Sequence, residues 1–223
     1  LRAGVWLGGI MPLYPIKVVM LPILYSFRRC PYAIRARMTL HYAGIQVELR
    51  EVLLKDKPAS MLAVSSKGTV PVLIFPDGQV MDESYDVMRW ALANRDPDHW
   101  WLSDRENEIN ELIQFNDHEF KTHLDHYKYF DRFPEHTKEY YRAQAENFLS
   151  ILEEKLTANH YLLGENMCLA DIAVFPFIRQ FAFVDKAWFD QAPYPNLQRW
   201  LAYFLESALF LEVMEKYPVW SDQ

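Results

Sequence analysis

The sequence is poor in cysteine, in long apolar runs and in net positive charge. Only two cysteines, Cys30 and Cys168, occur in 223 residues. Two such distant cysteines form no disulfide framework and are typical of a reducing compartment, so we expect a cytoplasmic location. No apolar stretch reaches the roughly 20 residues that a membrane-spanning helix needs, so we expect no membrane insertion.

Acidic side chains are in surplus. The chain has 30 Asp and Glu against 23 Lys and Arg, which gives a formal net charge of -7 at pH 7. Because binding to nucleic acid needs a basic face that neutralises phosphates, this balance argues against nucleic acid as the main partner. The apolar fraction of 51% and the charged fraction of 24% are typical of a globular protein with a sizeable core.

One short segment combines an apolar run, a cysteine and a proline. Residues 23–25 predict a buried strand, and a helical pattern opens at Pro31. Proline suits the first turn of a helix, because the amide hydrogen that it lacks would have no partner there. The pattern therefore places Cys30 at or just before a helix N-terminus.

The surroundings expected for Cys30 favour its thiolate form. Free amides and the dipole at a helix N-terminus stabilise an anion, and cationic neighbours lower a thiol pKa from ~8.5 to ~3.5–7.5. Arg28, Arg29 and Arg35 can supply this positive charge. Cys30 is therefore our candidate catalytic nucleophile. The alternative interpretation is an inert buried cysteine, which is how most free cysteines behave.

Residues 21–98 show the pattern of one α/β domain. The predicted elements follow the order βαβαββα and cover residues 23–26, 31–43, 47–52, 59–65, 72–75, 80–81 and 84–92. Pro71 stands at the entrance of an apolar run and cannot donate to a strand ladder. We therefore expect a strand edge or a cis peptide bond at this position.

From Asp104 onward the pattern is helical throughout. The polar, proline-bearing residues 95–103 mark the expected domain boundary. Helical runs are predicted over residues 104–131, 136–157, 169–184, 194–206 and 207–216. We expect an all-helical second domain over residues 104–217. Residues 1–20 are interpreted as an accessory N-terminal extension.

The first-domain order, with a cysteine at its first helix and a proline before its third strand, resembles a thioredoxin-like domain. Followed by a helical domain, it resembles the glutathione transferase superfamily. The tetrapeptide Cys30-Pro31-Tyr32-Ala33 is similar to the glutaredoxin motif with its second cysteine replaced. This similarity points to the cysteine-type, omega-like classes. The resemblance implies glutathione as cosubstrate, a small electrophile or disulfide as second substrate, and a homodimer.

The resemblance also implies a set of site residues. The implied glutathione-binding residues are Tyr32, Lys57, Val70, Pro71, Glu83 and Ser84. Candidates for the second-substrate pocket are Phe27, Tyr32 and His118.

Each implied glutathione contact has a physical rationale. The backbone of Val70 could pair with the cysteinyl part of glutathione, as in the addition of one strand residue. Lys57 could reach the glycyl carboxylate, and Glu83 could pair with the ammonium group. Ser84 and the free amides at the start of its helix could bind the γ-glutamyl carboxylate. The alternatives are plain helix capping at positions 83–84, a solvated loop lysine at position 57, and a purely structural cis-proline at position 71.

Three histidines and the second cysteine are other candidates for chemistry. His118, His123 and His126 lie on an acidic stretch without a His-Glu-x-x-His spacing, so we expect a solvated or cleft-facing stripe and no metal site. Cys168 stands where the superfamily usually has a helix-capping Ser or Thr, with Asp171 three residues later. We expect a weaker cap or capping by Asp171 alone, and a structural role for Cys168.

These features predict a glutathione-dependent thiol transferase or reductase. Its mechanism would be monothiol, because Ala33 provides no resolving thiol. One alternative is a transferase that conjugates glutathione to electrophiles, with Cys30 incidental. Another is a non-catalytic protein-interaction module with the same fold.

Overall fold

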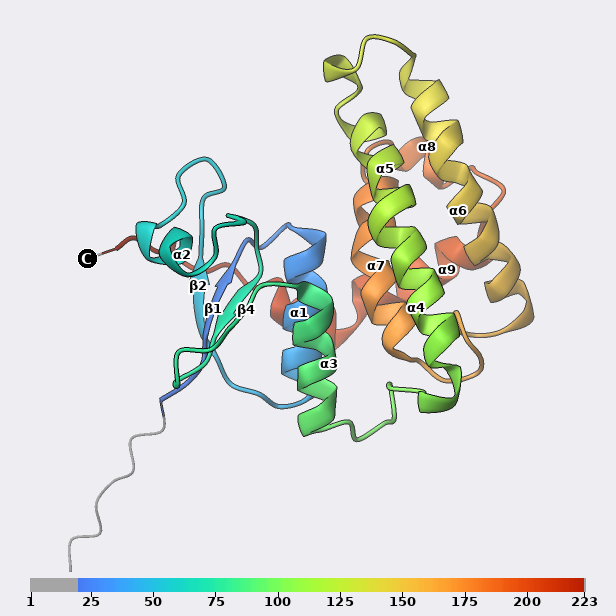
Figure 1. The fold of residues 1–223 in the computed structure, drawn as a ribbon. Helices are drawn as coiled ribbons and strands as arrows, with labels where there is room; N and C mark the ends of the chain where they lie inside the picture. Colours follow the sequence, from blue (N-terminus) through green and yellow to red (C-terminus); the bar gives the residue numbers. More distant parts are fainter. Residues whose placement is uncertain (1–19, 223) are drawn as a thin grey trace, which may run out of the picture.

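The computed structural model describes residues 20–222. A four-stranded sheet with helices on both faces forms the first domain, and helices alone build the second (Figure 1). The predicted order of an α/β domain followed by an all-helical domain is confirmed. The interpretation of residues 1–20 concerns a segment that, apart from Met20, lies outside the described residues.

The first domain contains all the strands that belong to the sheet. Its elements are β1 (Ile23–Ser26), α1 (Pro31–Tyr42), β2 (Glu48–Glu51), α2 (Ala59–Val64), β3 (Val72–Ile74), β4 (Val80–Met81) and α3 (Ser84–Asn94). The sheet order is β2-β1-β3-β4, with β1 parallel to β2 and antiparallel to β3, and β3 antiparallel to β4. The predicted elements are all present, with ends within about two residues of the predictions.

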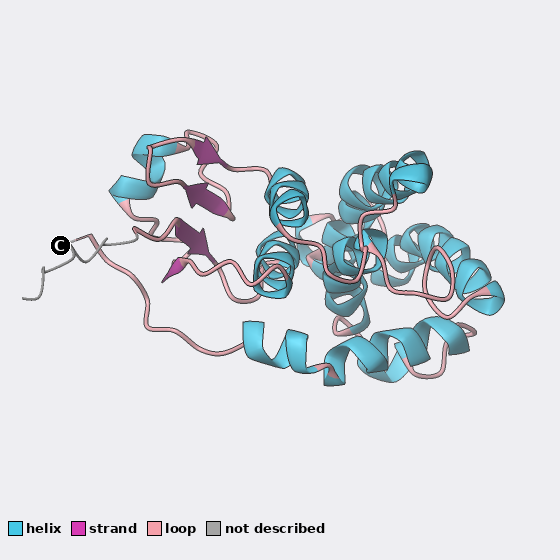
Figure 2. Ribbon diagram, turned by 90° about the horizontal axis from the view of Figure 1, so that it is seen from below, coloured by secondary structure: helices cyan, strands magenta, loops and turns pink. Residues whose placement is uncertain are grey.

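The alternation of side chains along the strands divides the first-domain core into two layers. Leu24 and Leu73 pack with residues of α1 and α3 on one face. Tyr25 and Val72 pack with Met61 of α2 on the other face. As a result α1 and α3 lie between the sheet and the second domain, whereas α2 covers the far side (Figures 1 and 2).

The second domain is a bundle of helices. Its elements are η1 (Ser103–Arg105), α4 (Glu106–Gln114), η2 (Phe115–Phe120), α5 (Lys121–Lys128), η3 (Phe130–Arg132), α6 (Lys138–Ala158), α7 (Leu169–Ala182), α8 (Lys186–Phe189), α9 (Pro195–Glu206) and α10 (Ala208–Val213). The helix predicted over residues 104–131 is in fact α4, the π-helical turn η2 and α5 in direct succession. The short α8 is not predicted by the sequence, since four residues are too few to show a helical period.

Helix α1 is enclosed on two sides, and this position buries two of its arginines. Its residues contact α3 within the first domain and α7 and α10 of the second. Arg35 and Arg37 are only 1% and 5% exposed. The guanidinium of Arg35 makes a bidentate pair with Asp117 in η2, with N···O distances of 2.8 and 2.6 Å. Since a buried charge needs a partner, this pair ties the two domains together.

The C-terminal segment returns to the first domain (Figure 2). Val219 forms a parallel bridge with Glu51 at the end of β2, and the amide of Trp220 donates to the Glu51 carbonyl at 2.7 Å. The guanidinium of Arg50 lies 4.0 Å from the centre of the Trp220 ring. The predicted helical domain over residues 104–217 is therefore followed by a tail that packs on the sheet of the first domain.

The described residues contain neither a membrane-spanning helix nor a cluster of metal ligands. Over residues 20–222, the structure contains no helix with both the length and the apolar character that a bilayer span requires. Within the same range, no three His, Cys, Asp or Glu side chains are grouped so that they could hold a metal ion.

Candidate active site

Cys30 occupies the N-cap position of α1, directly before Pro31. Its amide donates to the Phe27 carbonyl at 3.0 Å, and its carbonyl accepts the first helical hydrogen bond from Ile34 at 2.9 Å. The thiol is partly exposed, and Sγ lies 3.7 Å from the carbonyl oxygen of Val70. The sequence-based placement of Cys30 at a helix N-terminus is confirmed.

The segment before β3 lies against this thiol. The Val70-Pro71 peptide bond is cis, in agreement with one of the two interpretations of Pro71. The ladder between β1 and β3 extends only to Val72, so Val70 lies beyond its end. The backbone of Val70 is therefore placed beside Cys30 without being used by the sheet.

A pocket of about 890 Å³ opens between the two domains next to Cys30. This volume lies in the ~300–1,000 Å³ range of small-molecule sites. Five predicted site residues line it: Phe27, Cys30, Tyr32, Lys57 and Val70. The facing wall comes from the second domain and includes Lys121, Asp125, Lys128, Tyr129, Arg179 and Phe183. The first domain thus supplies the thiol, and the second supplies much of the charge.

Four predicted residues lie outside this lining. Pro71 is adjacent to it, and Glu83 and Ser84 lie at the start of α3. His118 is an exposed residue of η2, and Lys121, at the start of α5, lines the pocket instead. Roles for these four residues in ligand binding stay predictions.

Both residues at the start of α3 have partners within the protein. Glu83 is exposed and forms an ion pair with Lys67. Ser84 is buried, and its hydroxyl oxygen accepts from Nε of Arg35 at 3.0 Å. A hydroxyl that accepts in this way still has its own proton to donate. Ser84 is therefore oriented by the same arginine that joins the domains.

Tyr32 forms part of an aromatic and cationic stack behind the thiol. Its ring meets that of Phe177 edge-on, with 4.8 Å between centroids. The guanidinium carbon of Arg35 lies 5.1 Å from the Tyr32 ring centre and 5.2 Å from that of Phe177. These contacts fix the tyrosine that lines the pocket directly after the Cys-Pro pair.

The predicted lowering of the Cys30 pKa is wrong. Burial raises the pKa of this thiol, and it outweighs the amides of Ala33 and Tyr32 and the charges of Lys121 and Arg37, which act in the opposite direction. Arg35, expected as a cationic neighbour, is instead paired with Asp117. The sulfur is thus protonated more readily than an exposed thiol.

The raised pKa predicts how alkylation of Cys30 depends on pH. The rate with iodoacetamide is expected to keep rising as the pH passes the ordinary thiol pKa of ~8.5, because only the thiolate reacts and burial raises the pKa of Cys30. Lys121→Met removes a charge that lowers this pKa, so the midpoint is expected to move further up. Mass-spectrometric rates measured across pH provide the test. A midpoint below ~8 in the unaltered chain would contradict the prediction.

Arg37 organises the loop that leads to Cys30. Its guanidinium donates to the hydroxyl of Ser26 at 2.5 Å and to the carbonyl of Arg28 at 2.8 Å. Its Nε donates to the carbonyl of Val213 at the end of α10, at 3.1 Å. The second domain therefore helps to hold the residues directly before the thiol.

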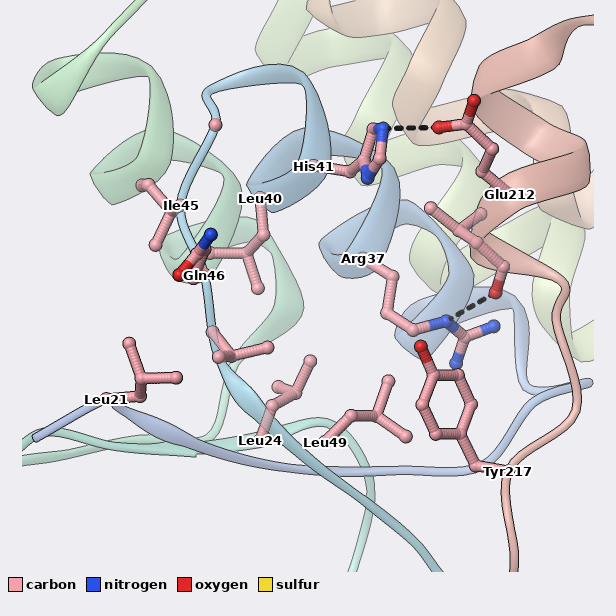
Figure 3. Close-up of a pocket in the computed structure, with 13 residues that line it drawn as sticks. Leu21, Leu24, Arg37, Leu40, His41, Ile45, Gln46, Leu49, Glu212 and Tyr217 are labelled. Atoms are coloured by element: carbon pink, nitrogen blue, oxygen red, sulfur yellow. Dashed lines mark hydrogen bonds and ion pairs between the residues drawn. The ribbon is translucent and has the colours of Figure 1, made fainter.

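A second pocket, of about 550 Å³, is lined by residues of β1, β2, the later turns of α1 and the end of α10 (Figure 3). Leucines form much of its lining, and Arg37 and the ion pair between His41 and Glu212, at 2.7 Å, also line it (Figure 3). None of the described residues that line it is a cysteine. This pocket lacks the thiol that marks the first one.

The residues missed by the sequence analysis are the cations of the second-domain wall. Lys121 and Lys128 are at the two ends of α5, and Arg179 is in the last turn of α7. Charged residues on a helix are usually solvated, and nothing in the pattern shows which helical face meets the first domain. Only the packing of the two domains distinguishes these three residues from other surface cations.

Comparison with known proteins agrees with this architecture. Residues 24–99 match the profile of the glutathione S-transferase N-terminal domain, and residues 107–208 match that of the C-terminal domain. The glutathione S-transferase GstA of Escherichia coli O157:H7 is 27% identical over 168 residues, which cover 70% of this chain and 80% of the relative. Mouse glutathione S-transferase omega-1 is 39% identical over 61 residues, but these cover only 27% of this chain and 25% of the relative.

Solved structures show the same fold. A glutathione transferase family member from Pseudomonas fluorescens, with two glutathione molecules bound, has a TM-score of 0.76 and 21% identity, and the match covers 90% of this chain and 95% of that one. A glutathione transferase from Pseudomonas putida, with one glutathione disulfide bound per subunit, has a TM-score of 0.73 and 19% identity, with coverage of 90% and 94%. The two domain profiles together account for most of the chain, and the chain belongs to the glutathione transferase superfamily.

Proposed function

We propose that this protein is a glutathione-dependent thiol transferase that acts through Cys30. The observation that carries the proposal is the thiol of the partly exposed Cys30 at the start of α1, which lines a pocket and lies 3.7 Å from the carbonyl oxygen of Val70, to which it donates. The glutathione and glutathione disulfide bound to two proteins of the same fold support the choice of ligand. Glutathione is the cosubstrate in this proposal, and a small disulfide is the second substrate.

Glutathione would lie along the first-domain side of the pocket. The backbone of Val70 would pair with its cysteinyl part and bring the glutathione sulfur close to Cys30. Lys57 lines the same pocket and would meet the glycyl carboxylate. The hydroxyl of Ser84, oriented by Arg35, would donate to the γ-glutamyl carboxylate at the far end.

The proposed reaction has two thiol–disulfide exchanges. The Cys30 thiolate attacks the glutathionyl sulfur of a mixed disulfide, the substrate S–S bond breaks, and the second thiol leaves as a thiolate that takes a proton from water. A second glutathione, as thiolate, then attacks the Cys30–glutathione disulfide, which releases glutathione disulfide and restores Cys30. Because the pKa of Cys30 is raised, its thiolate is the minority species near neutral pH, so exchange should accelerate as the pH rises.

Incubation with glutathione disulfide tests the proposal directly. The intact mass is expected to increase by one glutathionyl group, and peptide mapping should locate that group on Cys30. Excess reduced glutathione should then remove it. A protein that gains no mass, or that is modified only at Cys168, would overturn the assignment of the nucleophile.

Conjugation of glutathione to electrophiles is the second candidate. The raised pKa of Cys30 favours it, because a thiol that stays protonated can donate a hydrogen bond to a glutathione thiolate. Activity on an aryl halide that survives replacement of Cys30 by serine, whose hydroxyl can donate the same hydrogen bond, would support this candidate. Failure to be retained on immobilised glutathione, together with absence of both activities, would favour a protein-interaction module. The proposal also includes a homodimer, which the family resemblance implies, and a cytoplasmic location, which the cysteine content implies. Sedimentation would test the dimer.

A further inference from the structure

The pocket beside Cys30 has a charge opposite to that of the whole chain. Five cationic side chains line it: Arg29, Lys57, Lys121, Lys128 and Arg179. Asp125 is the one acidic residue in the lining, whereas the chain as a whole has a net charge of -7. Such a local reversal of charge concentrates anions in a cleft.

Most of these cations have no partner of opposite charge. Lys121 forms an ion pair with Asp125 on the same helix. Over residues 20–222, no carboxylate oxygen lies within 4.0 Å of the charged nitrogens of the other four. The pocket therefore has four positive charges that the described part of the protein does not neutralise.

Arg179 is held without any hydrogen-bond partner for its Nε, which is buried. Its guanidinium carbon lies 5.4 Å from the ring centre of Phe183 and 5.5 Å from that of Phe210. Burial, followed by repulsion from Arg28 and Arg29, lowers its pKa. An unpaired buried donor is costly, and an anion that accepts from it would remove that cost.

One glutathione molecule does not account for these charges. It carries two carboxylates and one ammonium group, so its net charge at neutral pH is about -1. Its expected position uses Lys57, which comes from the first domain. Lys128 and Arg179 lie on the second-domain wall, and Arg29 is in the loop directly before Cys30. These three cations are therefore available to bind the second thiol of a mixed disulfide, which is the part of the substrate that is not glutathione.

We propose that Arg29, Lys128 and Arg179 form an anion subsite that selects mixed disulfides of glutathione with small carboxylate-bearing thiols. The proposal rests on the proposed function, since it assigns the second substrate of the same reaction. When Cys30 attacks the glutathionyl sulfur, the S–S bond breaks and the acidic thiol leaves as a thiolate beside these cations. Their charge favours both the bound carboxylate and the departing thiolate, which then takes a proton from water.

Three disulfides of glutathione that differ in one charge provide the kinetic test. The partners are 3-mercaptopropionate, 2-mercaptoethanol and cysteamine, which are anionic, neutral and cationic. Each kcat/KM is divided by the rate of the same disulfide with free glutathione, which corrects for leaving-group reactivity. The anionic substrate is expected to exceed the neutral one by about tenfold, the cationic one should be slowest, and added salt should narrow the differences.

Matched variants identify the residues that cause the preference for the anionic disulfide. Arg179→Met and Lys128→Met are each expected to remove most of the preference for the anionic disulfide over the neutral one. Arg199→Met removes the same charge from an exposed position on α9, outside the pocket lining, and should leave the preference as it is. A preference that is absent, or that Arg199→Met lowers as much as Arg179→Met, would overturn the subsite.

A binding measurement separates the subsite from the chemistry. S-(2-carboxyethyl)glutathione and S-propylglutathione cannot undergo disulfide exchange, and calorimetry should show tighter binding of the acidic conjugate by about tenfold, with loss of the difference in Arg179→Met. Equal affinities would overturn the subsite even if Cys30 performs exchange. Absence of exchange with all three disulfides would overturn the proposed function. The difference in affinity between the two conjugates would still show whether the anion subsite exists.

Discussion

Replacing Cys30 by serine is expected to lower the rate of glutathione-dependent disulfide exchange by at least about a thousandfold. The hydroxyl of serine fits the same position at the start of α1, but it is not ionised near neutral pH and is a poor nucleophile toward a disulfide sulfur. The coupled reduction of a mixed disulfide of glutathione gives the rate. Binding of S-propylglutathione should change little, since the contacts expected from Val70 and Lys57 do not involve the sulfur of Cys30.

Cys168 provides the matched control for this replacement. It is the other cysteine of the chain, and it is fully buried at the start of α7. Burial and the neighbouring Asp171 carboxylate raise its pKa, so it should be unreactive. Cys168→Ala is therefore expected to retain exchange activity. Exchange that persists in Cys30→Ser and is lost in Cys168→Ala would reverse the assignment of the nucleophile.

The position of Cys30 could be predicted because its signals are local. A strand followed by Cys-Pro and a helical period fixes a thiol at a helix N-terminus, and the structure confirms this arrangement. Pro71 is equally informative, since a proline at the entrance of an apolar strand has few permitted roles. The order of the first-domain elements followed from the same kind of pattern.

The electrostatics of the thiol could not be predicted from neighbours in sequence. Arg35 lies five residues after Cys30, but it points to Asp117, which is 82 residues away in the chain. Lys121 is distant in sequence and yet acts on the thiol. Because the balance between burial and charge depends on how the domains pack, the sequence alone predicts the wrong direction for the shift of the Cys30 pKa.

The position of the C-terminal tail could not be predicted from the sequence either, because it depends on tertiary packing. Asp222 accepts from the amide of Ser60 in the first turn of α2 at 3.1 Å, and Trp220 packs with the core on the α2 side of the sheet. A short polar segment with one tryptophan has no period that would predict this return. Lys57 lies in the loop before α2, so the tail stabilises the same part of the first domain that supplies a predicted glutathione contact.

Asp171 is the buried centre of a network at the start of α7. Its Oδ1 accepts from the amide of Leu162 and from Nε1 of Trp200, both at 2.9 Å. Its Oδ2 accepts from the amide of Cys168 at 3.0 Å and from the Cys168 thiol at 3.3 Å. Asp171 thus caps the helix, but Cys168 takes part as well, because its side chain completes a capping box with the backbone of Asp171. The expectation that Asp171 caps alone is therefore wrong. One carboxylate therefore satisfies donors from the loop before α7, from the N-cap residue of α7 and from α9.

Asp171→Ala is expected to destabilise the protein by about 3–5 kcal/mol, because it leaves two backbone amides and an indole N–H buried without acceptors. For a chain of this size, each kcal/mol lowers the melting temperature by roughly 2–4 °C.

Asp185→Ala is the matched control. Asp185 also caps a helix, α8, but it is partly exposed and its side chain accepts there only from the amide of Trp188, at 3.0 Å. Its loss should cost about 1 kcal/mol. Urea denaturation followed by circular dichroism measures both variants, and equal losses would show that the network around Asp171 adds nothing beyond an ordinary cap.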